Sequence, residues 1–202
     1  MNADSALYSD TLTMFSWYVD PECRWLIMGG ADTMSVVYDA RSMDWVADLP
    51  YSTGIYGGFG SPTNVDYIAL GTGSSDVVFL DGATFSERRV VKLPRKQAEP
   101  VPVPTPSGKF VLVKETLAHS GSYAGIIVID TLGNILYDSS FVYEEAVLSP
   151  NGELLAWVVD TVLKIVRVAD GSTVTTISTS DPMRIQFLCL SFSHDGRLLA
   201  AG

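Results

Sequence analysis

Cysteine and histidine are scarce in this sequence of 202 residues, which contains only Cys23, Cys189, His119 and His194. Two cysteines cannot build a disulfide framework. Neither histidine stands in a short-spaced cluster of the kind that binds zinc. An Asn-x-Ser/Thr acceptor for glycosylation is also absent. These absences favour a reducing compartment, and we expect neither a metal nor another cofactor.

Long hydrophobic runs are missing as well, although 47% of the residues are hydrophobic. No stretch approaches the 18 or so apolar residues that a membrane span needs. Near the amino terminus, Asp4 and Asp10 stand where a signal peptide would carry basic residues. We therefore expect no membrane span and an intracellular protein, cytoplasmic with a nuclear location left open.

The sequence also lacks helical periodicity and local catalytic motifs. No window keeps apolar residues at i, i+3, i+4 and i+7, which argues against the α/β nucleotide-binding folds. Residues Gly71–Ser75 are glycine-rich, but another apolar run follows them, so they predict a turn between strands. There is no Gly-x-Ser-x-Gly elbow. The alternative of a catalytic set whose residues are scattered through the sequence, without a local motif, is left open.

Strand-like segments fill most of the chain. Short runs rich in Val, Ile, Leu, Phe and Tyr, such as Val77–Leu80, Ile126–Ile129 and Leu163–Val168, alternate with turns of Gly, Asp, Asn, Ser and Pro. This pattern is typical of an all-β protein. The choice is then between a sandwich, a barrel and a propeller.

An internal repeat decides between these three. A turn followed by a hydrophobic strand occurs five times, most clearly at Ser149–Trp157 and Ser193–Ala201. The second residue of each turn stands at positions 21, 62, 106, 150 and 194, and the last three intervals are 44 residues each. That interval is the period of a four-stranded propeller blade.

A second marker runs in phase with the first. In each full repeat a further apolar strand ends in an aspartate, 18, 19, 24 and 20 residues after the turn marker, and these residues are Asp39, Asp81, Asp130 and Asp170. Another turn and a fourth apolar run follow each of them. Two markers in register over four copies indicate four complete blades.

Two segments carry a family resemblance. Val36–Ser42, with its Tyr38-Asp39 pair, resembles the third strand and turn of a WD repeat, and Leu190–Ala200 resembles the first two strands. The family's Trp-Asp pair reads Tyr-Asp, Leu-Asp, Ile-Asp and Ala-Asp here, and its Gly-His pair is missing. The chain is thus similar to a degenerate WD-repeat β-propeller. The resemblance implies a platform that binds other proteins.

The expected fold is one partial β-propeller over residues 1–202. Its blades are expected at approximately 13–50, 51–94, 101–140 and 144–179, and the first two strands of a fifth blade at 185–202. An open strand edge at Arg197–Ala201 would invite aggregation. We therefore expect further sequence or another chain to complete the ring.

Charge is distributed unevenly along this acidic chain, whose net charge is −10. Residues 88–114 hold seven basic and one acidic residue, whereas residues 1–87 hold two and twelve, and residues 115–202 hold four and ten. An acidic body argues against general nucleic-acid binding, which needs a broad basic surface. The basic segment predicts either contact with an acidic partner or a solvated strand edge and linker.

Proline is concentrated in the same region. Pro94–Pro106 contains five prolines, and residues 100–104 are predicted to be extended. We interpret the segment as an unusually long connection between blades two and three. It is either a docking arm, a ligand for a proline-binding domain, or a stiff spacer.

Two enlarged segments are predicted to meet on one face of the propeller. They are the connection Pro94–Pro104 and the segment Glu115–Gly125 between the second and third strands of blade three. Loops on a rigid scaffold commonly carry recognition. The residues there best suited to contact a partner are Arg95, Lys96, His119 and Tyr123. The alternative is that both segments are tolerated insertions.

The function predicted from sequence is a protein–protein interaction or scaffolding module rather than an enzyme. One alternative is a propeller enzyme or the propeller portion of a hydrolase, with acidic and histidine side chains converging in the central channel. Another is a structural subunit of a large assembly, in which neighbouring chains cover the strand edges.

Overall fold

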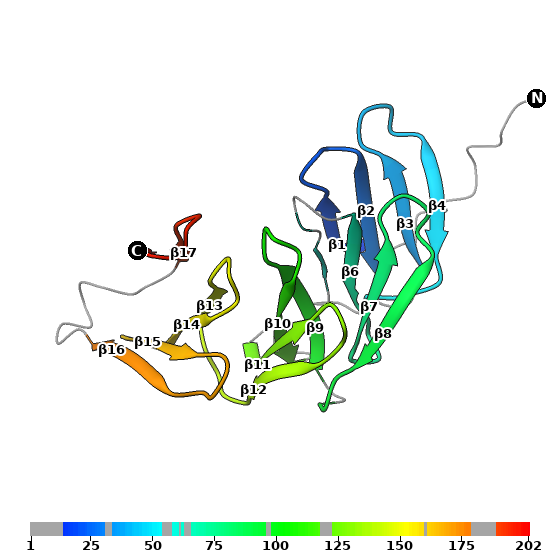
Figure 1. The fold of residues 1–202 in the computed structure, drawn as a ribbon. Coiled ribbons are helices and arrows are strands. Elements are labelled where there is room, and N and C mark those ends of the chain that lie inside the picture. The colour runs from blue at the N-terminus through cyan, green and yellow to red at the C-terminus, as the bar shows by residue number, and fades with distance from the viewer. Residues whose placement is uncertain are drawn as a thin grey trace, which may run out of the picture.

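The computed structural model describes residues 14–30, 34–53, 58–60, 62, 66–95, 98–117, 123–159, 161–178 and 189–202. Every regular element within these residues is a β-strand. The strands form four four-stranded antiparallel sheets and one two-stranded sheet. Figure 1 shows these sheets following one another in an arc, face against face. The predicted all-β propeller, with four full blades and the first two strands of a fifth, is confirmed.

The strands of each blade pair in chain order, so that each blade is a meander. The first blade comprises β1 (Met14–Val19), β2 (Trp25–Gly30), β3 (Ser35–Asp39) and β4 (Trp45–Leu49). The second comprises β5 (Phe59–Gly60), β6 (Tyr67–Gly71), β7 (Asp76–Asp81) and β8 (Glu87–Lys92). The third comprises β9 (Ala98–Pro104), β10 (Phe110–Leu117), β11 (Tyr123–Asp130) and β12 (Ile135–Ser139).

The remaining strands repeat the pattern. The fourth blade comprises β13 (Glu145–Leu148), β14 (Leu154–Val159), β15 (Val162–Arg167) and β16 (Thr173–Ser178), and the fifth sheet comprises β17 (Leu190–Phe192) and β18 (Leu199–Ala201). The first strands of neighbouring blades contact each other, as β5 does with β9 and β13 with β17. Strand β6 is buried throughout, and the fourth strand β16 is exposed throughout. First strands therefore lie inside the arc, and fourth strands outside.

The core consists of layers between blades. Between blades two and three, Ala69 and Phe79 pack with Val111 and Ile127, and the other three interfaces are built in the same way. Because successive side chains of a strand point to opposite faces, Val111 faces blade two while Leu112 faces blade four. This explains why the inner strands carry apolar residues on both faces: each interior blade is buried on two sides.

The turn aspartates (Asp39, Asp81, Asp130 and Asp170) explain the second sequence marker. Asp39, Asp81 and Asp130 each end a third strand, whereas Asp170 lies in the turn three residues after β15 ends at Arg167. Each accepts hydrogen bonds from its turn. The Asp39 carboxylate accepts from the backbone N–H groups of Arg41 and Ser42 at 2.9 and 2.8 Å. The other three carboxylates accept from backbone N–H groups of their own turns in the same way. The repeat therefore conserves a turn that the aspartate side chain satisfies.

Hydrogen bonds lower the pKa of every turn aspartate below its ordinary value. For Asp81 the largest cause is the hydrogen bond from the Arg88 side chain, and for Asp170 it is the one from the Ser172 side chain. For Asp39 the main cause is the backbone N–H of Ser42. For Asp130, partial burial acts to raise the pKa, but hydrogen bonds from Asn134 outweigh it. The folded state therefore binds protons at these sites less readily than the unfolded chain.

Stability is expected to decrease as the pH falls below about 4, the ordinary carboxyl pKa. A carboxyl whose folded pKa is depressed contributes stability above its unfolded pKa and loses it as the pH falls through the folded pKa. Burial raises the pKa of Glu115, which acts in the opposite sense but is a single group. Urea unfolding at pH 7, 4 and 3 measures the effect. Asp39→Asn with Asp130→Asn is expected to flatten the pH dependence, and the control Asp44→Asn to retain it. Equal slopes in all three proteins would contradict this assignment.

The proline-rich segment is largely a strand, and its interpretation as a connection is wrong for residues 98–104. Strand β9 pairs with β10 along its whole length, with Pro100 opposite Glu115 and Pro102 opposite Val113. Prolines at every second position place the nitrogens that lack hydrogen on one edge, away from β10. As the innermost strand of its sheet, β9 pairs with no further strand on that side. Blade three therefore begins at Ala98 rather than at residue 101.

Strand β9 also lies unusually close to blade two. The Gly58 amide donates to the Pro100 carbonyl at 3.2 Å. A Cβ atom added at Gly60 would lie 2.4 Å from the Pro102 carbonyl oxygen, and one added at Gly71 would lie 1.8 Å from that of Pro100. Neither approach is possible for a side chain, so glycine is required where these two blades meet.

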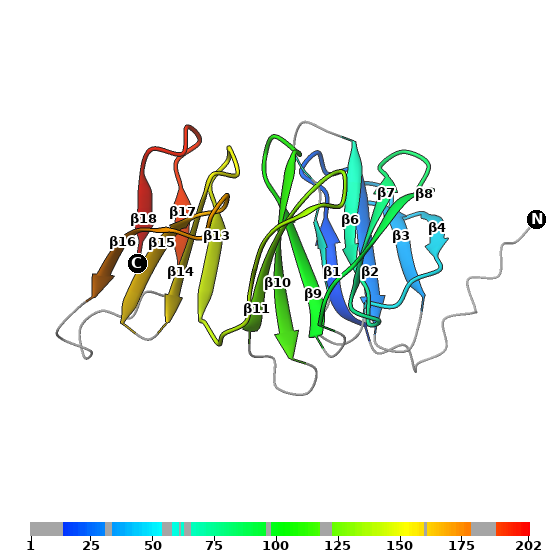
Figure 2. The same cartoon turned by 60° about the horizontal axis from the view of Figure 1, so that its bottom comes forward.

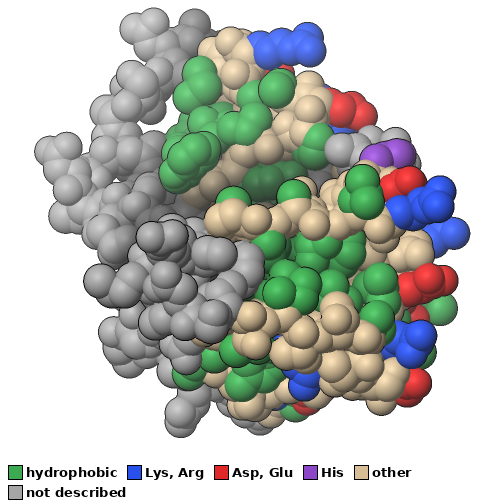
Figure 3. Space-filling model, turned by 90° about the vertical axis from the view of Figure 1, so that its left-hand side faces the viewer, with side chains coloured by type: hydrophobic (Ala, Val, Ile, Leu, Met, Phe, Trp, Pro, Cys, Tyr) green, Lys and Arg blue, Asp and Glu red, His purple; other side chains and the backbone are tan. Residues whose placement is uncertain are grey.

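The fifth sheet covers only part of blade four. Leu163 and Ile177 are cross-strand neighbours on one face of that blade. Leu163 is buried against Leu190, whereas Ile177 is 48% exposed. Figure 3 looks onto this end of the arc and shows hydrophobic side chains gathered there. Completion of the ring by further sequence or another chain stays a prediction.

Candidate functional site

The described ends of the segments predicted to contact a partner lie on one face of the arc. We call this the connection face; it carries the links between blades and the loops between second and third strands, around Ser52, Ser75, Arg95 and Tyr123. Ser75, in the β6–β7 loop, donates to the Ala98 carbonyl at 2.6 Å. The opposite turn face, uppermost in Figure 2, carries the hairpin turns, including those of the turn aspartates. The described ends of the two enlarged segments contact each other on the connection face, through Arg95 and Glu115.

The two predicted contact residues that the structure describes lie apart from each other. Arg95 and Tyr123 are described, whereas Lys96 and His119 lie outside the described residues. Arg95 contacts Glu115, and Tyr123 contacts Lys114. Because Lys114 and Glu115 are adjacent on β10, they point to opposite faces of blade three. Arg95 thus lies at the interface with blade two, and Tyr123 at the interface with blade four.

Arg95 already binds carboxylates of its own chain. Its Nε pairs with Glu115 Oε2, and its Nη2 lies 2.6 Å from Asp138 Oδ1. The Glu115 side chain is fully buried, and that of Arg95 is 27% exposed. Burial raises the pKa of Glu115, although the Arg95 guanidinium opposes this. Arg95 is therefore a structural link between blades two and three, which sequence reasoning did not anticipate.

Tyr123 is held by an aromatic stack. Its ring lies parallel to that of Tyr143, with 5.0 Å between centroids and 13° between planes. The Lys114 ammonium lies 5.6 Å from the Tyr123 ring centroid and pairs with Glu145. Tyr143 donates its hydroxyl to the Gly125 carbonyl at 3.2 Å. The half-buried Tyr123 ring thus forms part of a rigid seam between blades three and four.

A second candidate site lies on the turn face. A cavity of about 470 Å³ opens between blades two and three, and we call it the cationic groove; it is lined by Tyr67, Phe79, Arg88, Arg89, Ser107, Gly108, Lys109 and Thr131. The rings of Tyr67 and Phe79 meet edge to face at 5.3 Å. The Tyr67 hydroxyl donates to the Gly108 carbonyl at 3.1 Å. Blade two therefore supplies an aromatic base, and a turn of blade three closes one side.

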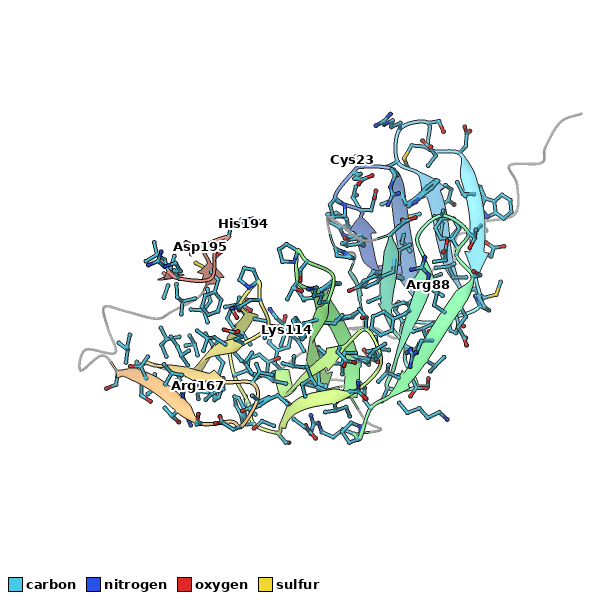
Figure 4. All side chains as sticks on the ribbon, in the orientation of Figure 1. Cys23, Arg88, Lys114, Arg167, His194 and Asp195 are labelled. Atoms are coloured by element: carbon cyan, nitrogen blue, oxygen red, sulfur yellow. The ribbon has the colours of Figure 1, made fainter. Side chains whose placement is uncertain are left out.

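The three cations of the groove differ in their partners. Arg88, labelled in Figure 4, pairs with Asp81, whose pKa this contact holds well below the ordinary value. Arg89 donates to the Leu132 carbonyl in blade three. Within the described part of the chain, the exposed Lys109 ammonium makes no ion pair. The groove therefore keeps a net positive charge in an acidic protein.

The part of the chain that the structure describes contains no group of three or more His, Cys, Asp or Glu side chains placed to hold a metal ion. Cys23 and Cys189 are exposed free thiols. The described residues also include no helix long and apolar enough to cross a membrane.

Comparison with known proteins gives a match in structure. Neither a protein-family model nor a curated protein matches this sequence. A solved structure of Kuenenia stuttgartiensis hydrazine synthase matches with a TM-score of 0.65 at 17% sequence identity, over 100% of this chain. The likeness is one of fold. This chain spans 58% of the length of that chain.

Proposed function

We propose that this chain is a non-enzymatic, WD-repeat-like propeller module that binds other proteins through its connection face. The WD-like character rests on the turn aspartates, which hold the turn after each third strand. The partner-binding role rests on the rigidity of the connection face. Recognition loops are most effective when a rigid scaffold holds their ends.

Hydrogen bonds between blades are the observation that carries the proposal. The Gly73 amide, in the β6–β7 loop, donates at 2.9 Å to the carbonyl of Ser52, which lies in the link between blades one and two. Ser75 in the same loop donates to Ala98 at the start of β9. The links into blades two and three are thus tied to one loop, which fixes the enlarged segment Pro94–Pro104 at Ala98.

The test compares two matched double variants, one on each face. Each variant replaces a basic residue by glutamate and a histidine by alanine. Lys96→Glu with His119→Ala alters the connection face, and Arg197→Glu with His194→Ala makes the same exchange on the turn face. Arg95 and Tyr123 are left intact because they hold blades together. Affinity capture of partners, quantified by mass spectrometry, is expected to fall at least about tenfold for the first pair only, equivalent to about 1.4 kcal/mol.

The thermal midpoint of each variant serves as the control for folding. Unchanged capture by the connection-face variant, with loss confined to the turn-face variant, would reject the proposed contact surface. Loss of capture with an unchanged thermal midpoint would support it.

A further inference from the structure

We infer that the cationic groove binds an acidic peptide segment of a partner protein, with carboxylates at the basic side chains and an apolar side chain on the aromatic base. The inference rests on the proposed function only in that the ligand belongs to another protein. It concerns the turn face, whereas the proposed function concerns the connection face. Four observations carry it: the position of the arginines in the repeat, the open space, the charge, and the apolar base.

The arginines are not required by the repeat. In blade two, Phe79 pairs with Arg89 and Leu80 with Glu87, so Arg88 is the extra residue of a β-bulge. Every full blade has this bulge between its third and fourth strands. The bulge residue and its successor in the other blades are Val46-Ala47, Leu136-Tyr137 and Val174-Thr175. The fold therefore tolerates uncharged residues there, and the cationic pair is specific to blade two.

The space beside Arg89, between blades two and three, is open. The corresponding space between blades three and four is filled by side chains. Tyr137 occupies the equivalent position in blade three, and its ring packs near that of Trp157, with 6.4 Å between centroids. Arg89 instead extends its guanidinium to the Leu132 carbonyl. A cavity of about 470 Å³ remains above Phe79 and Tyr67. This volume lies within the range of about 300–1,000 Å³ that is typical of ligand sites.

The charge of the groove favours a carboxylate ligand. Three basic side chains line it, and Asp81 is the acidic group paired with one of them. The Arg88–Asp81 pair is partly exposed, with the Arg88 side chain 45% exposed, so water already weakens it. A ligand carboxylate can therefore share Arg88 at little cost. Arginine binds carboxylates in a bidentate manner, and Lys109 adds a point charge.

The aromatic base favours a peptide over a nucleic acid. Tyr67 and Phe79 are each 3% exposed and lie edge to face, so the groove floor is mainly apolar and suits an aliphatic or aromatic side chain. Nucleic-acid binding depends on a broad basic surface, whereas this chain carries a net charge of −10. An acidic segment containing one apolar residue matches both parts of the groove.

The experiment measures fluorescence anisotropy of a labelled probe peptide, four glutamates on either side of one leucine, with the full chain. Arg89→Glu with Lys109→Glu is the groove variant. Arg167→Glu with Arg197→Glu is the matched control, which makes the same charge change on the turn face of blades four and five. The groove variant is expected to bind at least about tenfold more weakly, whereas the control binds as the unmodified chain does. Lys109→Glu alone, which breaks no ion pair seen in the described residues, should show part of the loss.

Three results would overturn the inference: equal binding by the groove variant, equal weakening in the control, or equally tight binding of a single-stranded oligonucleotide of the same net charge. The thermal midpoint of each variant is measured to confirm that the variant is folded. The connection-face variant Lys96→Glu with His119→Ala is expected to retain peptide binding. Failure of the groove thus leaves the capture experiment on the connection face unaffected, and the two proposals can fail separately.

Discussion

Arg95→Ala is expected to lower the free energy of unfolding by about 3–5 kcal/mol, because removing one partner of a buried ion pair leaves the other charge uncompensated. Glu115 is fully buried, and Arg95 is the cation that pairs with both it and Asp138. Urea unfolding at pH 7 measures the loss. The double variant Arg95→Met with Glu115→Leu is expected to recover most of it, because a well-packed apolar pair can replace a buried ion pair.

Lys92→Ala provides the control for this experiment. Lys92 ends β8, three residues before Arg95, and is exposed. Substitution of an exposed residue of this kind usually changes stability by less than about 0.5 kcal/mol. If Arg95→Ala unfolded at the same urea concentration as Lys92→Ala, the ion pair would have no structural role, and Arg95 would be available to a partner.

Gly71→Ala is expected to lower the free energy of unfolding by about 3 kcal/mol or more. This loss is at or above the upper end of the usual range for overpacking. The added Cβ would lie 1.8 Å from the Pro100 carbonyl oxygen and 2.7 Å from its carbon. Both are backbone atoms of a paired strand, so no side-chain rotation relieves the clash. Blades two and three must separate, which disrupts the layer that contains Ala69 and Val113. Thermal unfolding and urea titration both measure this effect.

Gly73→Ala is the matched control, two residues further along the chain. Gly73 is exposed, and its amide donates to the Ser52 carbonyl, a bond that alanine retains. We expect a change of less than about 0.5 kcal/mol at this surface position. Equal stability of the two variants would show that β9 can move away from blade two without loss.

The blades could be predicted from sequence because their markers act locally. A turn aspartate such as Asp39 bonds N–H groups two and three residues away, so its role depends on its own turn and little else. The turn Ser149–Gly152 is equally local: the Ser149 hydroxyl contacts Asn151, and Gly152 adopts a φ of 75° that favours glycine. Turns of this kind can be predicted from a single sequence.

Residues 100–104 were expected to be extended but were interpreted as a connection, because proline is rare in strands and locally favours an extended connection. Pairing with β10 overrides that preference, since the prolines need no hydrogen-bond donor on the free edge. A signal was present in the sequence: Pro100, Pro102 and Pro104 alternate with Val101 and Val103 at the period of a strand. An alternation of this kind should be counted as strand evidence at the inner edge of a blade.

The site residues were harder to predict because they depend on which face of a blade each side chain occupies. Arg95 and Tyr123 were expected together, yet they lie at different interfaces of blade three. The cationic groove combines Arg88 and Arg89 of one blade with Lys109 in a turn of the next. Sequence composition marked all three as a basic segment, but only strand register and the β-bulge show that they line one cavity.

The pairing of strands in chain order also bears on how the protein is made. In the described residues, every sheet joins consecutive strands, so the hydrogen bonds that pair strands link neighbouring parts of the sequence. Each blade is therefore a continuous stretch of sequence, and blades interact mainly with their nearest neighbours. During synthesis, each blade can form as soon as its fourth strand leaves the ribosome. The newest blade then presents an apolar face until the next one is complete, and this interval is when the nascent chain is most prone to aggregate.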